Sequence, residues 1–242
     1  MNTLNVDLYT VSGSVTIFCG YHDEQFIHDV LHSCLTAHLA AAELSDHRDD
    51  SWSLYQKTLS DLTWVTEDSQ SKCVLLSSKS VLELLLEAHG EHLSESDQQA
   101  LTQAFSVLQD LPKDSIPIQA ITRRFVADSA PVMTTPPTVN DPESPTRCAA
   151  QLTLIRDNRS IVTLRVTFET RHELDTEILN QPLLRTADEN AINAWSLSST
   201  MDSGIYAELS SDIDSYLGDH ALSEIIHIHL PAPLIDVAPP ST

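Results

Sequence analysis

Glycine is scarce in this sequence, with only five among 242 residues. Loops that bind nucleotide phosphates need several closely spaced glycines, because their backbone N–H groups must come close to the ligand. No such cluster occurs here, and the common nucleotide-binding folds are therefore disfavoured. The sequence also lacks a G-x-S-x-G motif, and none of its cysteines has the sequence context of a known catalytic cysteine.

Basic residues are also few. The chain has 13 Lys and Arg against 35 Asp and Glu, a formal net charge of −22 at pH 7. Residues 1–128 carry a net charge of −12 and residues 129–242 carry −10, so the acidity is not confined to a tail. Such a charge repels nucleic acids and anionic membranes and attracts basic partners. It also promotes solubility, so a functional acidic surface and a simply acidic composition both remain open.

Long apolar runs and cysteine motifs are missing as well. The longest apolar stretch, residues 81–86, is interrupted by Glu83 and is too short to cross a bilayer. The first ten residues have neither a basic segment nor a continuous apolar segment, so we predict a cytoplasmic protein. The four cysteines have no C-x-x-C spacing, and we expect free thiols.

Two periodicities are present in the sequence. Alternating apolar and polar residues predict a β-hairpin over residues 3–19 and a second hairpin around a turn at Asp157 and Asn158. Apolar residues spaced three and four apart predict amphipathic helices. The predicted helices cover 23–43, 51–62, 80–90, a segment opening at a Ser96–Gln99 capping box, a weak segment at 173–180, and 205–217; single extended segments are predicted at 116–126 and 222–230.

These elements predict an α+β fold with an antiparallel sheet, or two sheets, built from two β-hairpins plus single closing strands and covered by amphipathic helices. The similar order in the two halves suggests a ββα…β pseudo-repeat, and one sheet or two stacked sheets are both possible. We predict a hairpin plus helical bundle at 1–128, a proline-rich linker or long loop at 129–146, a small α+β subdomain at 147–230, and a flexible tail at 231–242.

Histidines are the candidate metal ligands. His28 and His32 lie four residues apart in the first predicted helix, so they share one side of it and could chelate a metal with His22 or an acid from elsewhere. His227 and His229 alternate in the last predicted strand, where both rings would lie on one face about 7 Å apart. The competing interpretation of both pairs is ordinary half-exposed surface histidine.

The acids of the predicted helix faces are candidates for binding a basic partner, and we chose Asp29, Glu83 and Glu87 as exposed examples. Asp212 and Asp214 form an acidic pair in a predicted helix. Two residues on a helix separated by one position point in directions about 200° apart, so we expect no joint site there.

The leading hypothesis is a non-enzymatic binding protein whose acidic surface engages a basic protein, as an immunity protein, antitoxin, chaperone or DNA-mimic inhibitor would. No cofactor is expected in that case. The alternative is a metal-dependent hydrolase that uses one of the two histidine pairs. A third hypothesis is a structural subunit of a larger assembly.

Overall fold

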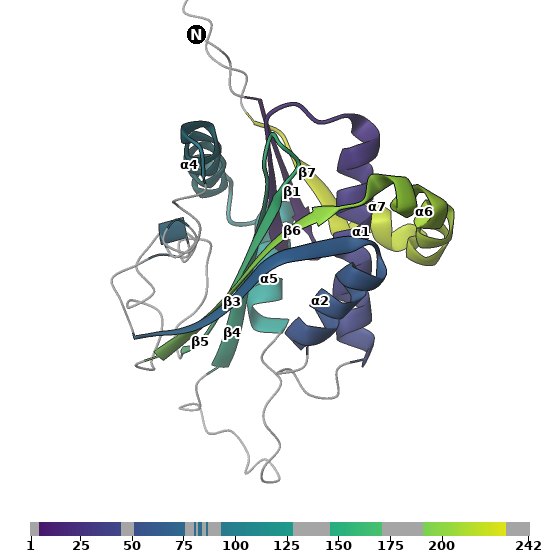
Figure 1. Ribbon diagram of the computed structural model, residues 1–242. Coiled ribbons are helices and arrows are strands. Elements are labelled where there is room, and N and C mark those ends of the chain that lie inside the picture. The colour runs from purple at the N-terminus through teal and green to yellow at the C-terminus, as the bar shows by residue number, and fades with distance from the viewer. Residues whose placement is uncertain are drawn as a thin grey trace, which may run out of the picture.

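The computed structural model of this chain describes residues 5–44, 51–75, 80, 82–83, 86, 93–127, 146–170 and 191–230. Within these residues, strands from both ends of the chain form a single sheet (Figure 1). The strands are β1 (Val6–Val11), β2 (Ser14–Cys19), β3 (Trp64–Leu75), β4 (Thr146–Ile155), β5 (Ile161–Thr170), β6 (Ala191–Met201) and β7 (Ile225–Ile228), and the helices are α1 (Glu24–Leu44), α2 (Ser51–Asp61), α4 (Glu95–Asp110), α5 (Ile116–Ala127), α6 (Ser203–Leu217) and α7 (Asp219–Glu224).

The strand order across the sheet is β3-β6-β5-β4-β2-β1-β7. All neighbouring pairs are antiparallel except β2 and β4, which run parallel with Val15 opposite Leu152. The predicted α+β class with a largely antiparallel sheet is confirmed, and the parallel pair places strands from both halves of the chain in one sheet. Of the predicted linker, only Thr146 is described; the predicted tail at 231–242 and the weak helix at 173–180 lie outside the described residues.

Both predicted hairpins are present. The first turns at Ser12 and Gly13, which have φ values of 48° and 78°. Two consecutive positive φ values define a mirror-image turn, whose twist matches that of the strands it joins. A Cβ atom at Gly13 would lie 2.5 Å from the carbonyl oxygen of Ala120 in α5, so this turn also requires glycine for close packing.

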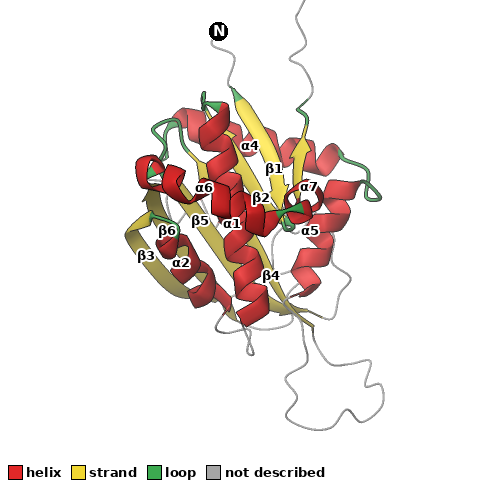
Figure 2. Cartoon of the chain, turned by 90° about the vertical axis from the view of Figure 1, so that its right-hand side faces the viewer, coloured by secondary structure: helices red, strands yellow, loops and turns green. Residues whose placement is uncertain are grey.

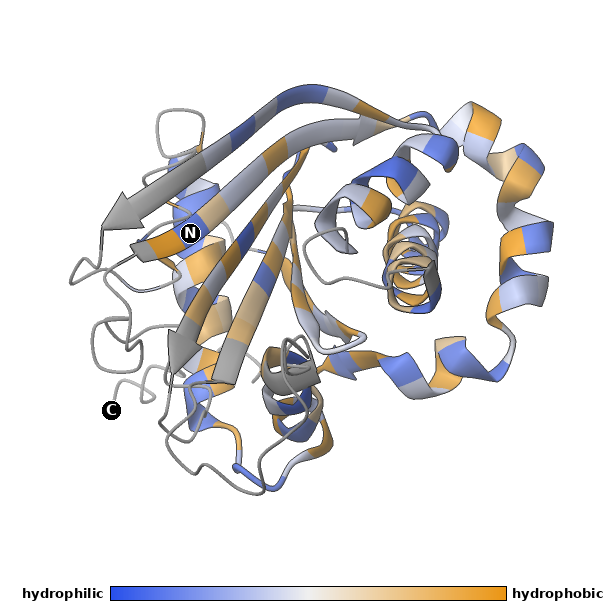
Figure 3. Ribbon diagram, turned by 90° about the horizontal axis from the view of Figure 1, so that it is seen from below, coloured by the Kyte–Doolittle hydropathy of each residue, from blue (hydrophilic) through white to orange (hydrophobic). Residues whose placement is uncertain are grey.

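Helices cover both faces of the sheet. In Figure 1, α4 lies on one side of the sheet, while α1, α2, α6 and α7 lie on the other; Figure 3 shows the same layers from below. Each face has its own apolar cluster. Leu8, Ile17 and Leu152 lie under Phe105 of α4 and Ile121 of α5, forming the first cluster. The second cluster includes Phe18, Phe26, Leu35, Tyr55, Leu59, Leu197 and Tyr206.

The extended segment predicted at 116–126 is wrong, because these residues form α5. Pro117 is compatible with a first helical turn, where a backbone N–H has no partner within the helix. Ile118, Ile121 and Phe125 recur at helical spacing and are all buried against the sheet. Burial of this apolar stripe outweighs the modest helix propensity of the β-branched isoleucines.

Other predicted boundaries need correction. The capping box of α4 pairs Ser94 with Asp97 rather than Ser96 with Gln99. Residue 222 lies in the short helix α7, so the last strand is shorter than predicted and begins at Ile225. The strands β3 and β6 were not predicted at all, since their sequences are mostly polar or irregular.

Candidate functional site

The two ends of the described chain meet on one side of the molecule. Strand β1 pairs with β7, with Leu8 opposite Ile228, and α1 packs beside α6 and α7. Figure 2 shows these helices in front of the sheet. Residues 1–47 and 186–242 together contain 15 acidic residues and not one Lys or Arg. The parts of these two segments that the structure brings together are β1 and α1 with α6, α7 and β7, and we call the surface of α1, α6 and α7 the acidic face.

Helix α6 is held at both ends by local hydrogen bonds. The Asp202 carboxylate accepts hydrogen bonds from the backbone N–H groups of Gly204 and Ile205, at 3.0 and 3.1 Å, and this N-cap begins the helix. The helix ends at Gly218, where the backbone turns at φ 46° into α7. The end predicted for this helix at residue 217 is confirmed. These ends fix Asp214 on the side of α6 that approaches α1.

His28 and His32 of α1 meet Asp214 of α6. The two imidazole rings lie one helical turn apart, with centroids 3.7 Å from each other. One carboxylate oxygen of Asp214 lies 2.7 Å from Nδ1 of His32 and 3.6 Å from Nε2 of His28. One ligand atom from each of the three residues lies within 4.8 Å of the other two, and the described residues contain no other such group of three.

Asp29 is buried behind this cluster. Its side chain is only 3 % exposed, so the exposed position that the sequence suggested for it is wrong. One carboxylate oxygen accepts a hydrogen bond from Nε2 of Gln25 at 2.7 Å and lies 3.5 Å from Nδ1 of His28. A buried carboxylate is costly unless hydrogen-bonded, and these two contacts supply its partners.

The electrostatics of the cluster favour neutral His32. Burial and the adjacent His28 lower the pKa of His32, and the Asp214 carboxylate opposes this shift without overcoming it. The hydroxyl of Tyr206, on the same helix as Asp214, is buried without a hydrogen-bond partner among the described residues. Burial and the nearby carboxylates of Asp29 and Asp214 raise the pKa of Tyr206.

A pocket of about 670 Å³ opens beside the three residues. It lies between α1, α6, α7, strand β1 and the edge strand β7, and its wall is largely apolar. The apolar and aromatic lining consists of Tyr9, Ile27, Leu31, Ala221, Leu222 and Ile225. An apolar concavity with a few convergent polar groups is the usual form of a small-molecule site.

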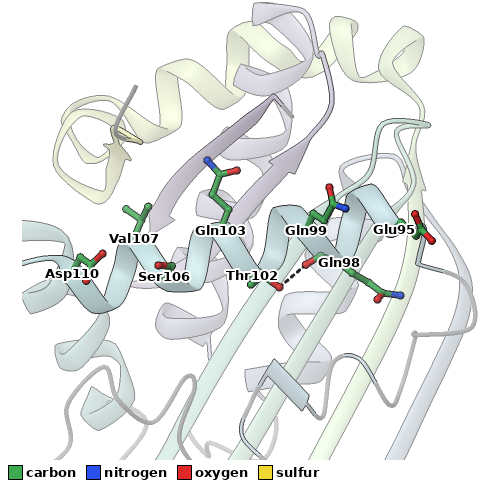
Figure 4. A pocket seen from close by; sticks show the side chains of 8 residues that line it. All are labelled: Glu95, Gln98, Gln99, Thr102, Gln103, Ser106, Val107 and Asp110. Carbon is green, nitrogen blue, oxygen red and sulfur yellow. Dashed lines mark hydrogen bonds between the residues drawn. The ribbon is translucent and has the colours of Figure 1, made fainter. Parts of the chain in front are cut away.

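A second pocket, of about 620 Å³, runs along α4 (Figure 4). All the described residues that line it come from this one helix, and its two acids, Glu95 and Asp110, lie at opposite ends. The side chains between them are neutral, and Thr102 donates its hydrogen bond back to the carbonyl of Gln98 within the helix. No set of charged groups converges there, so this pocket is the weaker candidate.

The acidic face also carries exposed apolar side chains. Ile205, Tyr216 and Leu222, in α6 and α7, are 53 %, 49 % and 85 % exposed. They account for half of the large exposed apolar side chains in the described part of the chain. Apolar anchors among charged residues are typical of protein-binding surfaces.

The second histidine pair lies at the sheet edge. His227 stacks on Tyr9, with ring centroids 4.5 Å apart, and its Nε2 lies 4.0 Å from a carboxylate oxygen of Asp7. His227 and His229 are both exposed, and among the described residues they gather no third ligand. Burial and the neighbouring His229 lower the pKa of His227, while Asp7 acts in the opposite direction.

The remaining predicted residues lie elsewhere. Glu83 is exposed and forms a capping box with Ser80, which confirms Ser80 as a helix N-cap. Glu87 lies outside the described residues. His22 is buried, and its Nε2 contacts the carbonyl oxygen of Cys19 at 3.0 Å, so it is not the third ligand that accompanies His28 and His32.

Asp214 is the residue that the sequence did not assign to this site. The divergence of Asp212 and Asp214 was a sound argument against a shared site, but it said nothing about either acid alone. Asp214 lies 182 positions from His32. Its spacing from Ile213 and Leu217, which are buried, was the one available signal that it borders the packed side of the helix.

Comparisons with known proteins give no family. No protein-family model matches the chain, and no curated protein matches it. Two solved structures resemble it weakly. The Evf virulence factor is 6 % identical over 87 % of this chain and 82 % of that chain, with a TM-score of 0.40. The activated Cyt2Ba monomer from Bacillus thuringiensis subsp. israelensis is 12 % identical over 77 % of this chain and 96 % of that chain, with a TM-score of 0.34. Similarity at this level carries no functional inference.

Among the described residues, no helix is both long enough and apolar enough to span a bilayer. Cys19, Cys34 and Cys148 are buried, and among the described residues they form no disulfide bond, as expected. Burial, followed by the nearby Asp97, raises the pKa of Cys19 to about 12, and burial also raises the pKa of Cys34 to about 12. Thiols held in the protonated form are poor nucleophiles, so neither cysteine is suited to covalent catalysis.

Proposed function

We propose that this protein is a non-enzymatic binding protein that engages a basic protein partner through its acidic face. The observation that carries the proposal is the packing of α1 beside α6 and α7 and the pairing of β1 with β7, elements that contain no Lys or Arg. A surface of one charge sign speeds association with an oppositely charged partner, because the long-range field steers the encounter.

The apolar side chains of α6 and α7 supply the second requirement of an interface. Charge contributes mainly to the association rate and to specificity, whereas affinity depends on buried apolar and aromatic anchors. Tyr216 and Leu222 are exposed on the same two helices as the acids Glu208, Asp212 and Asp219.

Localisation in the cytoplasm is part of the same proposal, since a basic protein partner such as a toxin or enzyme would be met there.

The test begins with capture of the partner from the source cells on the immobilised full-length chain, at low salt. Its association rate is then measured across a salt series for two double variants of equal net charge. Glu208→Lys with Asp212→Lys alters the acidic face, and Glu67→Lys with Asp68→Lys alters the exposed strand β3. We expect the first variant to lower the association rate about tenfold or more at low salt and the second to lower it less than about twofold.

Equal effects of the two double variants would show that the acidity acts as overall charge and not through this face. A wild-type association rate that does not change between low and high salt would show that the acidity serves solubility alone. Asp29 is buried and Glu83 caps a helix, so neither is the first choice for charge reversal.

The alternative hypothesis, a metal-dependent hydrolase, requires first of all that the chain hold a metal. One specific observation favours it over a structural subunit of a larger assembly: His28, His32 and Asp214 converge and all line the larger of the two pockets. The pair His227 and His229 has no comparable third group among the described residues.

A further inference from the structure

We propose that His28, His32 and Asp214 bind one divalent transition-metal ion of the Zn²⁺ type, with one coordination position left open to the adjacent pocket. A small molecule with an anionic head group and an apolar body would occupy that position. The site lies within the acidic face, and Leu222 lines its pocket. Metal binding and partner binding are measured independently, so either proposal can fail without the other.

The distances between the side chains fit such an ion. Bonds of about 2.0–2.2 Å in tetrahedral geometry place neighbouring ligand atoms about 3.4 Å apart. The contacts from the Asp214 carboxylate, 3.6 Å to Nε2 of His28 and 2.7 Å to Nδ1 of His32, lie within 1 Å of that value. The Asp214 side chain is 48 % exposed, so it has room to adjust.

The donor set selects the kind of metal. Two imidazole nitrogens and one carboxylate suit Zn²⁺, Co²⁺ or Ni²⁺, whereas Mg²⁺ and Ca²⁺ prefer oxygen ligands alone. Three protein ligands with a remaining open position are typical of zinc sites that bind an exogenous molecule. The absence of Lys and Arg from residues 1–47 and 186–242 also leaves no nearby cation from these segments to compete with the metal.

Asp29 supplies the outer contact that metal-binding histidines usually have. A metal-bound imidazole commonly directs its other ring nitrogen to a carboxylate, which fixes the tautomer and the ring orientation. Nδ1 of His28 faces the buried Asp29 carboxylate at 3.5 Å while Nε2 faces Asp214, and Gln25 holds Asp29 in place. An ion pair between α1 and α6 would account for the contact of His32 with Asp214, but not for a buried acid on the far side of His28.

The pocket determines the class of the additional ligand. All three proposed metal ligands line it, and the rest of the wall is chiefly aliphatic, including Ile27, Leu31 and Ile225. A bound divalent cation with a single carboxylate ligand keeps a net positive charge. That charge attracts an anionic head group, and the aliphatic wall favours an apolar body, as in a medium-chain carboxylate.

The experiment is a Co²⁺ titration of the metal-stripped full-length protein, followed by visible absorption, with Zn²⁺ added in competition. We expect one Co²⁺ per chain, an intense four-coordinate spectrum, and displacement by one equivalent of Zn²⁺. His32→Ala should weaken Co²⁺ binding about 100-fold or more, and Asp29→Asn about 10-fold, because Asp29 only orients His28.

The matched controls are Asp212→Asn, on the same helix as Asp214, and His220→Gln on α7; each should change the Co²⁺ affinity less than about twofold. Asp214→Asn, which removes the charge but little volume, should weaken binding about 10-fold or more. Circular dichroism of each metal-free variant checks that it is folded. Wild-type protein that binds no Co²⁺, or binding that His32→Ala and Asp214→Asn leave unchanged in folded protein, overturns the site and leaves only an ion pair between helices.

The open position is tested on the Co²⁺-loaded protein with octanoate and acetate. We expect octanoate to shift the cobalt spectrum at concentrations at least about 10-fold lower than acetate, because its alkyl chain also buries apolar surface. Equal potency of the two carboxylates would show that the pocket contributes nothing. No spectral change with either would show that the coordination sphere is closed.

Discussion

The two helical layers differ in how they use charge. On the layer formed by α4 and α5, the buried Asp97 carboxylate caps its own helix and accepts a hydrogen bond from Nε of Arg156 at 2.9 Å. On the acidic face, Glu208 and Asp212 are exposed, and residues 186–242 contain no Lys or Arg. In the first layer the Asp97 charge has internal partners, whereas on the acidic face Glu208 and Asp212 are exposed to solvent near exposed apolar groups.

This difference separates stability from binding. A buried ion pair with a capping role is costly to break, because the remaining partner is left without compensation. Exposed acids contribute little to folding and act at long range on whatever approaches. We therefore expect substitutions in the α4–α5 layer to change the free energy of unfolding, and substitutions on the acidic face to change binding.

The largest contrast is expected between Phe105 and Tyr216. Phe105 of α4 is 1 % exposed in the first apolar cluster, so Phe105→Ala should lower the free energy of unfolding by about 3–5 kcal/mol. Tyr216 of α6 is half exposed, and Tyr216→Ala should lower it by only about 0.5–1 kcal/mol. Urea denaturation measures both values. A loss as large for Tyr216→Ala would contradict the assignment of α6 to a binding surface.

The next contrast is between a buried acid, Asp97, and an exposed acid, Asp212. Burial raises the pKa of Asp97, but hydrogen bonds from Ser94 and from Arg156 lower it by more, so the pKa lies below its ordinary value. Asp97→Asn should cost about 2–4 kcal/mol at pH 7, and Asp212→Asn about 0.5 kcal/mol or less.

The pH dependence of the Asp97→Asn effect follows from the sign of that shift. A carboxyl group with a depressed folded pKa stabilises the protein above its unfolded pKa, about 3.9, and the contribution disappears as pH falls through the folded pKa. The difference between wild type and Asp97→Asn should therefore shrink below about pH 4. A difference that stays constant from pH 7 to pH 3 would show that charge is not its origin.

Two glycines in the positive-φ region sharpen the comparison. Alanine at Gly13 would be strained at φ 78° and would also meet α5, whereas alanine at Gly218 would be strained at φ 46° but would meet nothing within 4 Å. We expect Gly13→Ala to cost about 2–3 kcal/mol and Gly218→Ala about 1 kcal/mol, measured by chemical denaturation. Equal losses of unfolding free energy in the two variants would mean that the hairpin turn shifts enough to accommodate the added methyl group.

A further expected effect concerns His38, a buried histidine of the core. It is 2 % exposed, and burial, followed by the charges of Arg124 and Arg165, lowers its pKa well below the ordinary value. Below about pH 6.5 the unfolded chain binds a proton at His38, whereas the folded protein keeps this side chain neutral. The free energy of unfolding should therefore decrease by up to about 1.4 kcal/mol for each pH unit below about 6.5.

His38→Gln removes this proton linkage but keeps an acceptor for Arg124, whose Nη2 lies 3.2 Å from Nδ1 of His38. The slope of unfolding free energy against pH between 6.5 and 5 should become shallower in this variant. The exposed His220 serves as the control on the acidic face, and His220→Gln should leave the slope unchanged. An unaltered slope in His38→Gln would mean that other groups carry the pH dependence.

Local signals predicted the local structure well. The hairpin predicted over residues 3–19, the helical periodicity of α1 and α2, and the end of α6 at Leu217 are all as expected. Each rests on interactions within about four residues, or on a hairpin whose two strands are adjacent in sequence. The sequence did not reveal β3 and β6, because a strand with many polar residues is stabilised by pairing with strands far away in the chain.

The candidate site shows the same division. The spacing of His28 and His32 was enough to place both rings on one side of a helix, since helical geometry alone decides it. Which acid completes the group, and that Asp29 is buried behind it, depended on the packing of α6 against α1. The sequence by itself determined the elements, the overall acidity and the histidine pair. Only the tertiary structure decided that β1 and α1 lie beside β7, α6 and α7, because the pairing of β1 with β7 joins parts of the chain that no local interaction connects.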